Sequence, residues 1–155
     1  MCFFGYICMQ EILSDEIEDA KEEVRKNPDD PDAHIGLGVA YGARGKHKES
    51  IEPYKQVIRI DPDDAKAHYN LGIAYDKLDM QKESIESLKQ AIRINPDYEN
   101  AHLNLGIAYV SLNDRGSALE QYEILKSLDT KMEVLHEPSV STIHMANELF
   151  NLINK

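Results

Sequence analysis

The sequence repeats itself every 34 residues, and this period constrains the fold more than any other feature of the chain. Residues 31–64 are identical to residues 65–98 at 18 of 34 aligned positions, and residues 65–98 are identical to residues 99–132 at 10 positions. The most similar stretch reads AHIGLGVAY, AHYNLGIAY and AHLNLGIAY in the three copies. A fixed period of this length is typical of stacked supersecondary units, each of which needs a neighbour to bury its apolar face.

Each copy of the repeat predicts two helices joined by a tight turn. Apolar or bulky residues recur at positions 4, 7, 8 and 11, which fall on one stripe of a helix at about 100° per residue. A second amphipathic helix follows and ends before a proline, as in the segment 82–94 before Pro96. The position between the helices is occupied by Gly45, Asp79 and Asn113, residue types that tolerate a left-handed backbone. Asp residues at 63, 64 and 97 are expected to cap the helices that follow them.

The pattern H-x2-L-G-x2-Y, then S/A-x3-Y/L, then Pro, at this period resembles the tetratricopeptide repeat. The resemblance covers residues 31 to about 132. It implies an all-α fold in which tandem helix-turn-helix repeats stack into a right-handed superhelix, an α-solenoid. The chain departs from the family pattern in having His at position 4 (34, 68 and 102), Ser at position 20 in two copies, and Thr130 in place of proline. Without that proline, the last helix of the third repeat is expected to run on.

The two ends of the chain are expected to cap the stack. Pro28 lies 34 residues before Pro62, so the preceding segment aligns with the second helix of an incomplete repeat. At the other end, Ile143, Ala146, Leu149, Phe150 and Ile153 recur at helical spacing. The predicted organisation is an apolar tail (1–10), an N-terminal helix (11–30), three repeats (31–64, 65–98 and 99–132), an insertion (133–140) and a C-terminal capping helix (141–155).

Composition narrows the classes of function. The net charge of −11 offers no electrostatic footprint for nucleic acid. The two cysteines, Cys2 and Cys8, form no disulfide framework or zinc motif, which favours a cytoplasmic protein. The tail MCFFGYICM is too short to span a bilayer and lacks the features of a signal peptide. We expect it to cover the first repeat; the alternative is a membrane-associated assembly factor or co-chaperone-like protein tethered through this tail.

The family resemblance implies a partner-binding groove on the stripe of each first helix that faces away from the packing residues. An apolar strip on this face favours contact with a partner, although the ends of the chain or packing between repeats could cover it. Asn70 and Asn104 lie one repeat apart and could bond an extended backbone, or could be ordinary surface residues. The predicted groove residues are Ile35, Val39, Lys66, Tyr69, Asn70, Ile73, Lys77, Leu103, Asn104, Ile107 and Ser111.

The sequence favours a scaffold or adaptor over an enzyme. No nucleophile elbow, phosphate loop or HExxH motif is present, and the three repeated histidines are expected to be structural rather than metal ligands. We therefore expect no catalytic activity, cofactor, metal or small-molecule substrate. The Lys and Asn of the family's carboxylate clamp are absent, so the expected partner is an apolar or amphipathic protein segment, and the acidic charge favours a basic one. Self-association through uncovered end faces is a further alternative.

Overall fold

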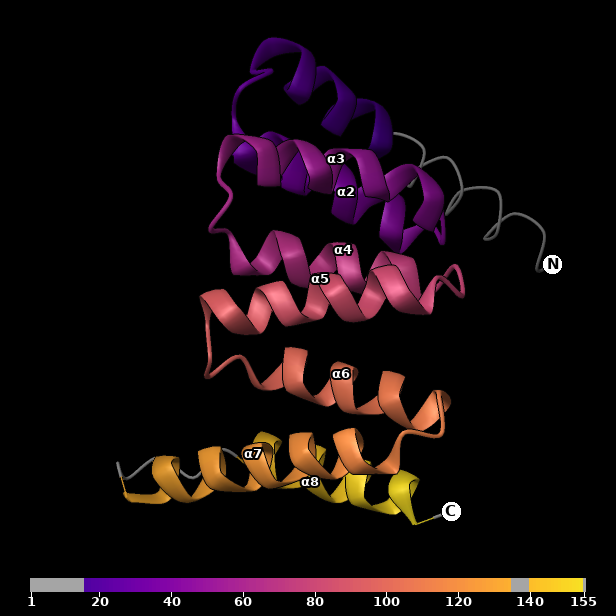
Figure 1. Cartoon of the computed structure of the whole chain (residues 1–155). Helices are drawn as coiled ribbons and strands as arrows, with labels where there is room; N and C mark the ends of the chain where they lie inside the picture. Colours follow the sequence, from indigo (N-terminus) through magenta and orange to yellow (C-terminus); the bar gives the residue numbers. More distant parts are fainter. Residues whose placement is uncertain (1–15, 135–139, 155) are drawn as a thin grey trace, which may run out of the picture. The chain divides into compact units, whose positions relative to one another are not determined.

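The computed structural model describes residues 16–134 and 140–154, and every regular element within these ranges is a helix (Figure 1). The chain divides into two compact units, Met1–Asp79 and Met80–Lys155. None of the described helices is long and apolar enough to cross a membrane. The predicted tail (1–10) and the first part of the predicted N-terminal helix lie outside the described residues.

Unit 1 contains a helix over residues 16–26, α2 (Pro31–Ala43), α3 (His47–Ile60) and α4 (Ala65–Asp76). The first helix lies where the incomplete repeat is expected, and it buries Ile17. α3 packs against both α2 and α4. The unit therefore holds an incomplete repeat, one full helical hairpin and the first helix of the next repeat.

Unit 2 contains α5 (Gln81–Ile94), α6 (Glu99–Ser111), α7 (Arg115–Val134) and α8 (Val140–Ile153). α6 packs against α5 and α7, and α8 packs against both α6 and α7. α7 has 20 residues whereas α3 and α5 have 14, as expected where Thr130 replaces the proline that follows those helices. The helices extend into both ends of the predicted insertion (133–140), and residues 135–139 lie outside the described part.

The turn between the two helices of each repeat has the predicted left-handed backbone. The φ angles are 68° at Gly45 and 58° at both Asp79 and Asn113. A side chain with a Cβ is strained in this region, and Gly, Asn and Asp tolerate it best. The three residue choices at this position are therefore explained by the turn alone.

Asp side chains cap two of the first helices. Asp30 accepts a hydrogen bond from the backbone N–H of Asp32 at 3.1 Å. Asp64 accepts one from the N–H of Ala67 at 2.8 Å, as predicted for that residue. The prediction for Asp97 is wrong, because α6 begins after Tyr98 and has no side-chain cap. There, Asn95 accepts the N–H of Asp97 at 3.2 Å and stabilises the turn before the helix.

The core of unit 1 is built where α3 meets its neighbours. Tyr54, Leu71 and Tyr75 form a buried cluster, with Ile51 and Ile58 packed against it. A Cβ added to Gly38 would lie 2.6 Å from the Tyr54 ring, so α2 can approach α3 this closely only with glycine at that position. The ammonium group of Lys55 lies 5.9 Å from the centre of the Tyr75 ring. In unit 2, Lys89 and Tyr109 repeat this cation–π contact at 5.7 Å, 34 residues later.

The core of unit 2 depends on the C-terminal helix. Its buried cluster comprises Ala118 and Leu125 of α7 and Ala146, Leu149 and Ile153 of α8. A Cβ added to Gly106 would lie 2.5 Å from a methyl group of Leu149. Gly106 and Gly38 occupy the same repeat position, so Leu149 packs against Gly106 as Tyr54 packs against Gly38.

Candidate partner-binding surface

A small cavity between α2, α3 and α4 brings two of the predicted groove residues together. This cavity, called here the α2–α4 hollow, has a volume of about 140 Å³. Its lining comprises Gly42 of α2, His47, Ser50 and Tyr54 of α3, and Asn70, Ile73 and Ala74 of α4. Glycine and serine leave space that larger side chains would fill. Burial raises the pKa of the Tyr54 hydroxyl, which therefore stays protonated at neutral pH.

The remaining predicted groove residues of unit 1 differ in accessibility. Val39 is 49% exposed and lies one turn before Gly42, on the same side of α2. Ile35 and Tyr69 are half-buried, whereas Lys66 and Lys77 are exposed. Tyr69 and Ile73 lie one turn apart on α4. Unit 1 thus presents a partly exposed apolar surface, formed by Ile35, Val39, Tyr69 and Ile73, next to the polar side chain of Asn70.

The two asparagines have different surroundings. Asn70 lines the α2–α4 hollow. The Asn104 amide donates a hydrogen bond to the carbonyl of Asn100, one turn earlier in α6, at 2.8 Å. Because the two residues belong to different units, their proposed action as a pair stays a prediction. Ser111, also on α6, is exposed and donates to the carbonyl of Ile107 at 3.1 Å.

The third repeat differs from the expected open apolar strip. Leu103 and Ile107 pack against the cluster that α7 and α8 form. The C-terminal helix was expected to cap this repeat. The cluster to which it contributes also contacts Leu103 and Ile107, the two apolar residues of this repeat that were assigned to the groove. The physical reason is the glycine at 106, which admits Leu149 against the α6 backbone. Leu103 and Ile107 are half-buried, as are Ile35, Tyr69 and Ile73, and Val39 of unit 1 is the most exposed residue of the predicted strip.

The repeated histidines are structural in their hydrogen bonding. In each repeat the histidine Nε2–H donates to the carbonyl of the proline six residues earlier. The distances are 2.8 Å from His34 to Pro28, 3.0 Å from His68 to Pro62 and 2.9 Å from His102 to Pro96. This bond ties the first helix of a repeat to the turn before it, which explains a polar ring where the family has a large apolar one. In the described part of the chain, no group of three or more His, Cys, Asp or Glu could hold a metal ion.

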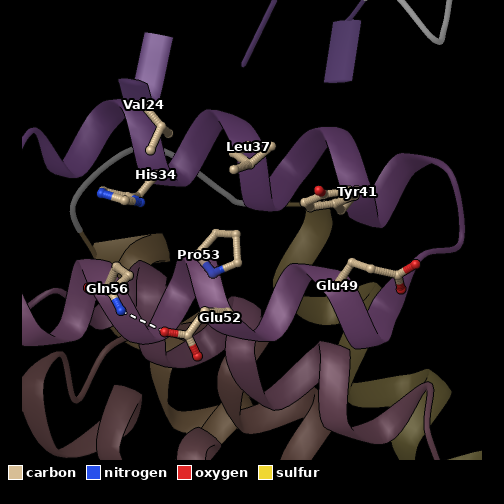
Figure 2. Close-up of a pocket in the computed structure, with 8 residues that line it drawn as sticks. All are labelled: Val24, His34, Leu37, Tyr41, Glu49, Glu52, Pro53 and Gln56. Carbon is tan, nitrogen blue, oxygen red and sulfur yellow. Dashed lines mark hydrogen bonds between the residues drawn. The ribbon is translucent and has the colours of Figure 1, made fainter. Parts of the chain in front are cut away.

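A second cavity in unit 1 was not predicted from the sequence. It has a volume of about 270 Å³ and lies among the helix 16–26, α2 and α3 (Figure 2). One sequence signal could have pointed to it: Pro53 stands inside α3, where the other repeats have Ser87 and Gln121. Proline inside a helix removes a backbone hydrogen bond, so its occurrence in one repeat only marks a local difference.

Comparison with known proteins agrees with this architecture. A family model described as TPR repeat matches residues 40–79 and 81–113. The chain carries tetratricopeptide repeats. No curated protein matches the sequence significantly.

Solved tetratricopeptide structures share the fold. The chain is similar to MamA, at 24% identity and a TM-score of 0.70, over 97% of this chain and 96% of that chain. It is similar to MamA 41-end from Desulfovibrio magneticus RS-1, at 22% identity and a TM-score of 0.73, over 81% and 71% of the two chains. The TPR2B domain of yeast Sti1, in a complex with pHsp70, matches at 20% identity and a TM-score of 0.68, over 90% and 96%. The predicted all-α fold of tandem helical repeats is confirmed.

Proposed function

We propose that the chain is a protein-interaction scaffold that binds a segment or helix of a partner protein on the first-helix face of unit 1. The observation that carries the proposal is the α2–α4 hollow, where Asn70 and Ile73 share the lining with Gly42, which lies one turn from the exposed Val39. Partly exposed apolar side chains around a hollow with a few polar groups are typical of a contact surface. The Sti1 structure supports the class of function, since that tetratricopeptide domain is in a complex with pHsp70.

The residues on this face define the kind of segment that would fit. Val39 and Ile73 would contact apolar side chains of the partner, and the Asn70 amide would donate to and accept from its backbone. A free carboxylate finds no lysine or asparagine at the positions that grip it in the clamp subclass, where this chain has Ile35 and Val39 instead. An apolar or amphipathic segment is therefore the proposed ligand, and the charge of −11 would attract a basic one.

Site-specific photo-crosslinking in an extract of the native source tests the proposal. A photoreactive phenylalanine analogue replaces Val39 or Ile73 in turn, and the same analogue at Lys48, an exposed residue of α3, serves as the control. We expect a common set of protein adducts from positions 39 and 73 that is absent at position 48. Competition by an unlabelled chain should remove these adducts, whereas an unlabelled chain with Val39→Asp and Ile73→Asp should not. Equal adducts at all three positions would show that this face has no special role.

A further inference from the structure

The second cavity of unit 1 lies on a different stripe of α2 from the proposed binding surface. Here we call it the N-terminal pocket; its lining comprises Val24, His34, Leu37, Tyr41, Glu49, Glu52, Pro53 and Gln56 (Figure 2). At about 270 Å³ it falls just below the range of sites for small molecules, about 300–1,000 Å³, and is large enough for a side chain. Its walls are apolar at Val24, Leu37 and Pro53.

Pro53 leaves a buried histidine with an unpaired ring nitrogen in the lining of this pocket. In unit 2, the side-chain amide of Gln121, the residue equivalent to Pro53, lies 2.8 Å from His102 Nδ1. Because His102 Nε2–H donates to Pro96, this Nδ1 is an acceptor, and the NH2 group of the Gln121 amide is its donor. The Pro53 side chain has no polar atom, and His34 has no partner at Nδ1 among the described residues. His34 is only 7% exposed. Because its Nε2–H donates to Pro28, the Nδ1 of the neutral ring is an acceptor.

Pro53 also frees a backbone acceptor. A residue in the middle of α3 normally donates its N–H to the carbonyl four residues earlier. Proline has no N–H, so the carbonyl of Glu49 lacks this donor. Glu49 also lines the pocket.

The side chains at the rim of the pocket are acceptors as well. Glu49 and Glu52 bring two carboxylates, and neither forms an ion pair within the described part of the chain. Gln56 donates its amide N–H to Glu52 at 2.6 Å, as Figure 2 shows, which leaves the Gln56 oxygen as a further acceptor. The cation Lys21 lies 2.7 Å from Glu18, and its ammonium group also interacts with the hydroxyl of Tyr41 at the edge of the pocket. The pocket thus combines apolar walls with acceptors and two negative charges.

We propose that the N-terminal pocket binds an arginine side chain presented by a partner protein. A guanidinium group has five donors in a planar array and no acceptor, and it is weakly hydrated, so it suits several acceptors set among apolar walls. Its flat face can stack on the Tyr41 ring. Residues 1–15 contain no lysine or arginine, so this part of the chain has no basic side chain for the pocket. The net charge of −11 attracts a basic partner over a longer range.

A peptide titration followed by NMR tests this assignment on the whole, isotope-labelled chain. The probe is the capped tripeptide Ac-Leu-Arg-Leu-amide, and the matched control replaces arginine with citrulline, which keeps the shape and loses the charge. We expect the arginine peptide to shift the amide signals of residues 34–56 and the citrulline peptide to bind at least about 5-fold more weakly, because charged hydrogen bonds are about twice as strong as neutral ones. Equal binding of both peptides, no shift, or shifts centred on α4 or α6 would overturn the proposal.

Two variants test whether the arginine peptide binds at the carboxylates of Glu49 and Glu52 and at His34. Glu49→Gln with Glu52→Gln should weaken the arginine peptide about 3- to 10-fold, since both charges are solvent-accessible. The control is Glu83→Gln with Glu86→Gln, the same positions one repeat later, where Gln90 donates to Glu86 as Gln56 does to Glu52. Pro53→Gln introduces the residue that the third repeat has at this position. It should reduce binding, because the glutamine side chain would bond the Nδ1 of His34. The proposal fails if the control variant weakens binding as much as the pocket variants do.

Discussion

At position 20 of the repeat, the hydroxyl group of a buried serine has a hydrogen-bond partner in one copy and none in the next. Ser50 and Ser84 are both fully buried, and Ala118 occupies the same position in the third repeat. The Ser50 hydroxyl donates to the carbonyl of His47 at 2.8 Å. The Ser84 hydroxyl has no hydrogen-bond partner among the described residues. The need for a small side chain is shared, but the need for a hydroxyl is not.

Replacing Ser84 with alanine should therefore stabilise the protein. A buried hydroxyl without a partner costs about 1–3 kcal/mol, and alanine is already accommodated at this position in the third repeat. We expect Ser84→Ala to raise the free energy of unfolding by up to about 1 kcal/mol, measured by urea denaturation followed by circular dichroism. Ser50→Ala is the matched control and should lower it by about 0.5–1.5 kcal/mol, because a hydrogen bond is lost. A loss of stability in Ser84→Ala equal to that in Ser50→Ala would contradict this interpretation.

Two glycines of α2 should respond in opposite directions to the same substitution. Gly38→Ala places a methyl group 2.6 Å from the buried Tyr54 ring, so we expect a loss of about 1–3 kcal/mol from overpacking. Gly36→Ala meets nothing within 4 Å and should gain about 0.5–1 kcal/mol, because alanine favours the helix. Thermal unfolding of both variants measures the difference. If both variants gain stability equally, helix propensity rather than the approach to Tyr54 governs position 38.

At the scale of the helix, the repeat predicts the turns and helix pairs that all copies share. It does not predict a contact that occurs in one copy only. The left-handed turns at Gly45, Asp79 and Asn113 follow from residue type at a fixed position, so the sequence predicts them correctly. The helix pairs follow from the stripe of apolar residues. α8 has no equivalent in the other repeats, and its contact with Leu103 and Ile107 depends on shape at Gly106. Periodicity carries no information about that contact.

The two candidate binding sites also differ in how far the repeat pattern predicts them. Two residues of the α2–α4 hollow, Asn70 and Ile73, were predicted to lie on the groove face because of their repeat positions, whereas the lining residues from α3 were not predicted. The N-terminal pocket depends on Pro53, which breaks the repeat pattern, and on the distance between three helices. Comparing the three copies shows that Pro53 replaces the polar residues Ser87 and Gln121 at this repeat position. This comparison does not by itself indicate a cavity. Its existence required the packing of α2, α3 and the helix 16–26.

The role of α8 in unit 2 gives a prediction for a single helix. Leu149 is fully buried and contacts the α6 backbone at Gly106, so Leu149→Ala should cost about 2–5 kcal/mol. The adjacent Phe150 is 45% exposed, and its ring centre lies 5.3 Å from that of Tyr122. We expect Phe150→Ala to cost about 0.5–1.5 kcal/mol. Guanidinium denaturation measures both, and equal losses would show that α8 is held by its exposed edge rather than by the contact at Gly106.

At the scale of the whole molecule, stacked repeats unfold according to contacts between neighbours. Each repeat in such a protein contacts mainly the next one, so stability is close to a sum of local terms and interface terms. The division of this chain at Asp79 and Met80 defines two compact units, each with its own buried cluster. The core of unit 1 is centred on Tyr54 and that of unit 2 on Leu149. A substitution in one core should therefore destabilise the helices of its own unit more than those of the other unit.

Amide hydrogen exchange in the Leu149→Ala variant tests this expectation. Loss of the Leu149 contact should speed exchange most in α6, α7 and α8, because these helices share the affected cluster. Exchange in α2, α3 and α4 should rise less, since their cluster around Tyr54 is unchanged. The reciprocal variant, Gly38→Ala, should reverse the order. Equal acceleration in all helices of both variants would mean that the two units open together, in which case binding at unit 1 would be coupled to the contact between α8 and the third repeat.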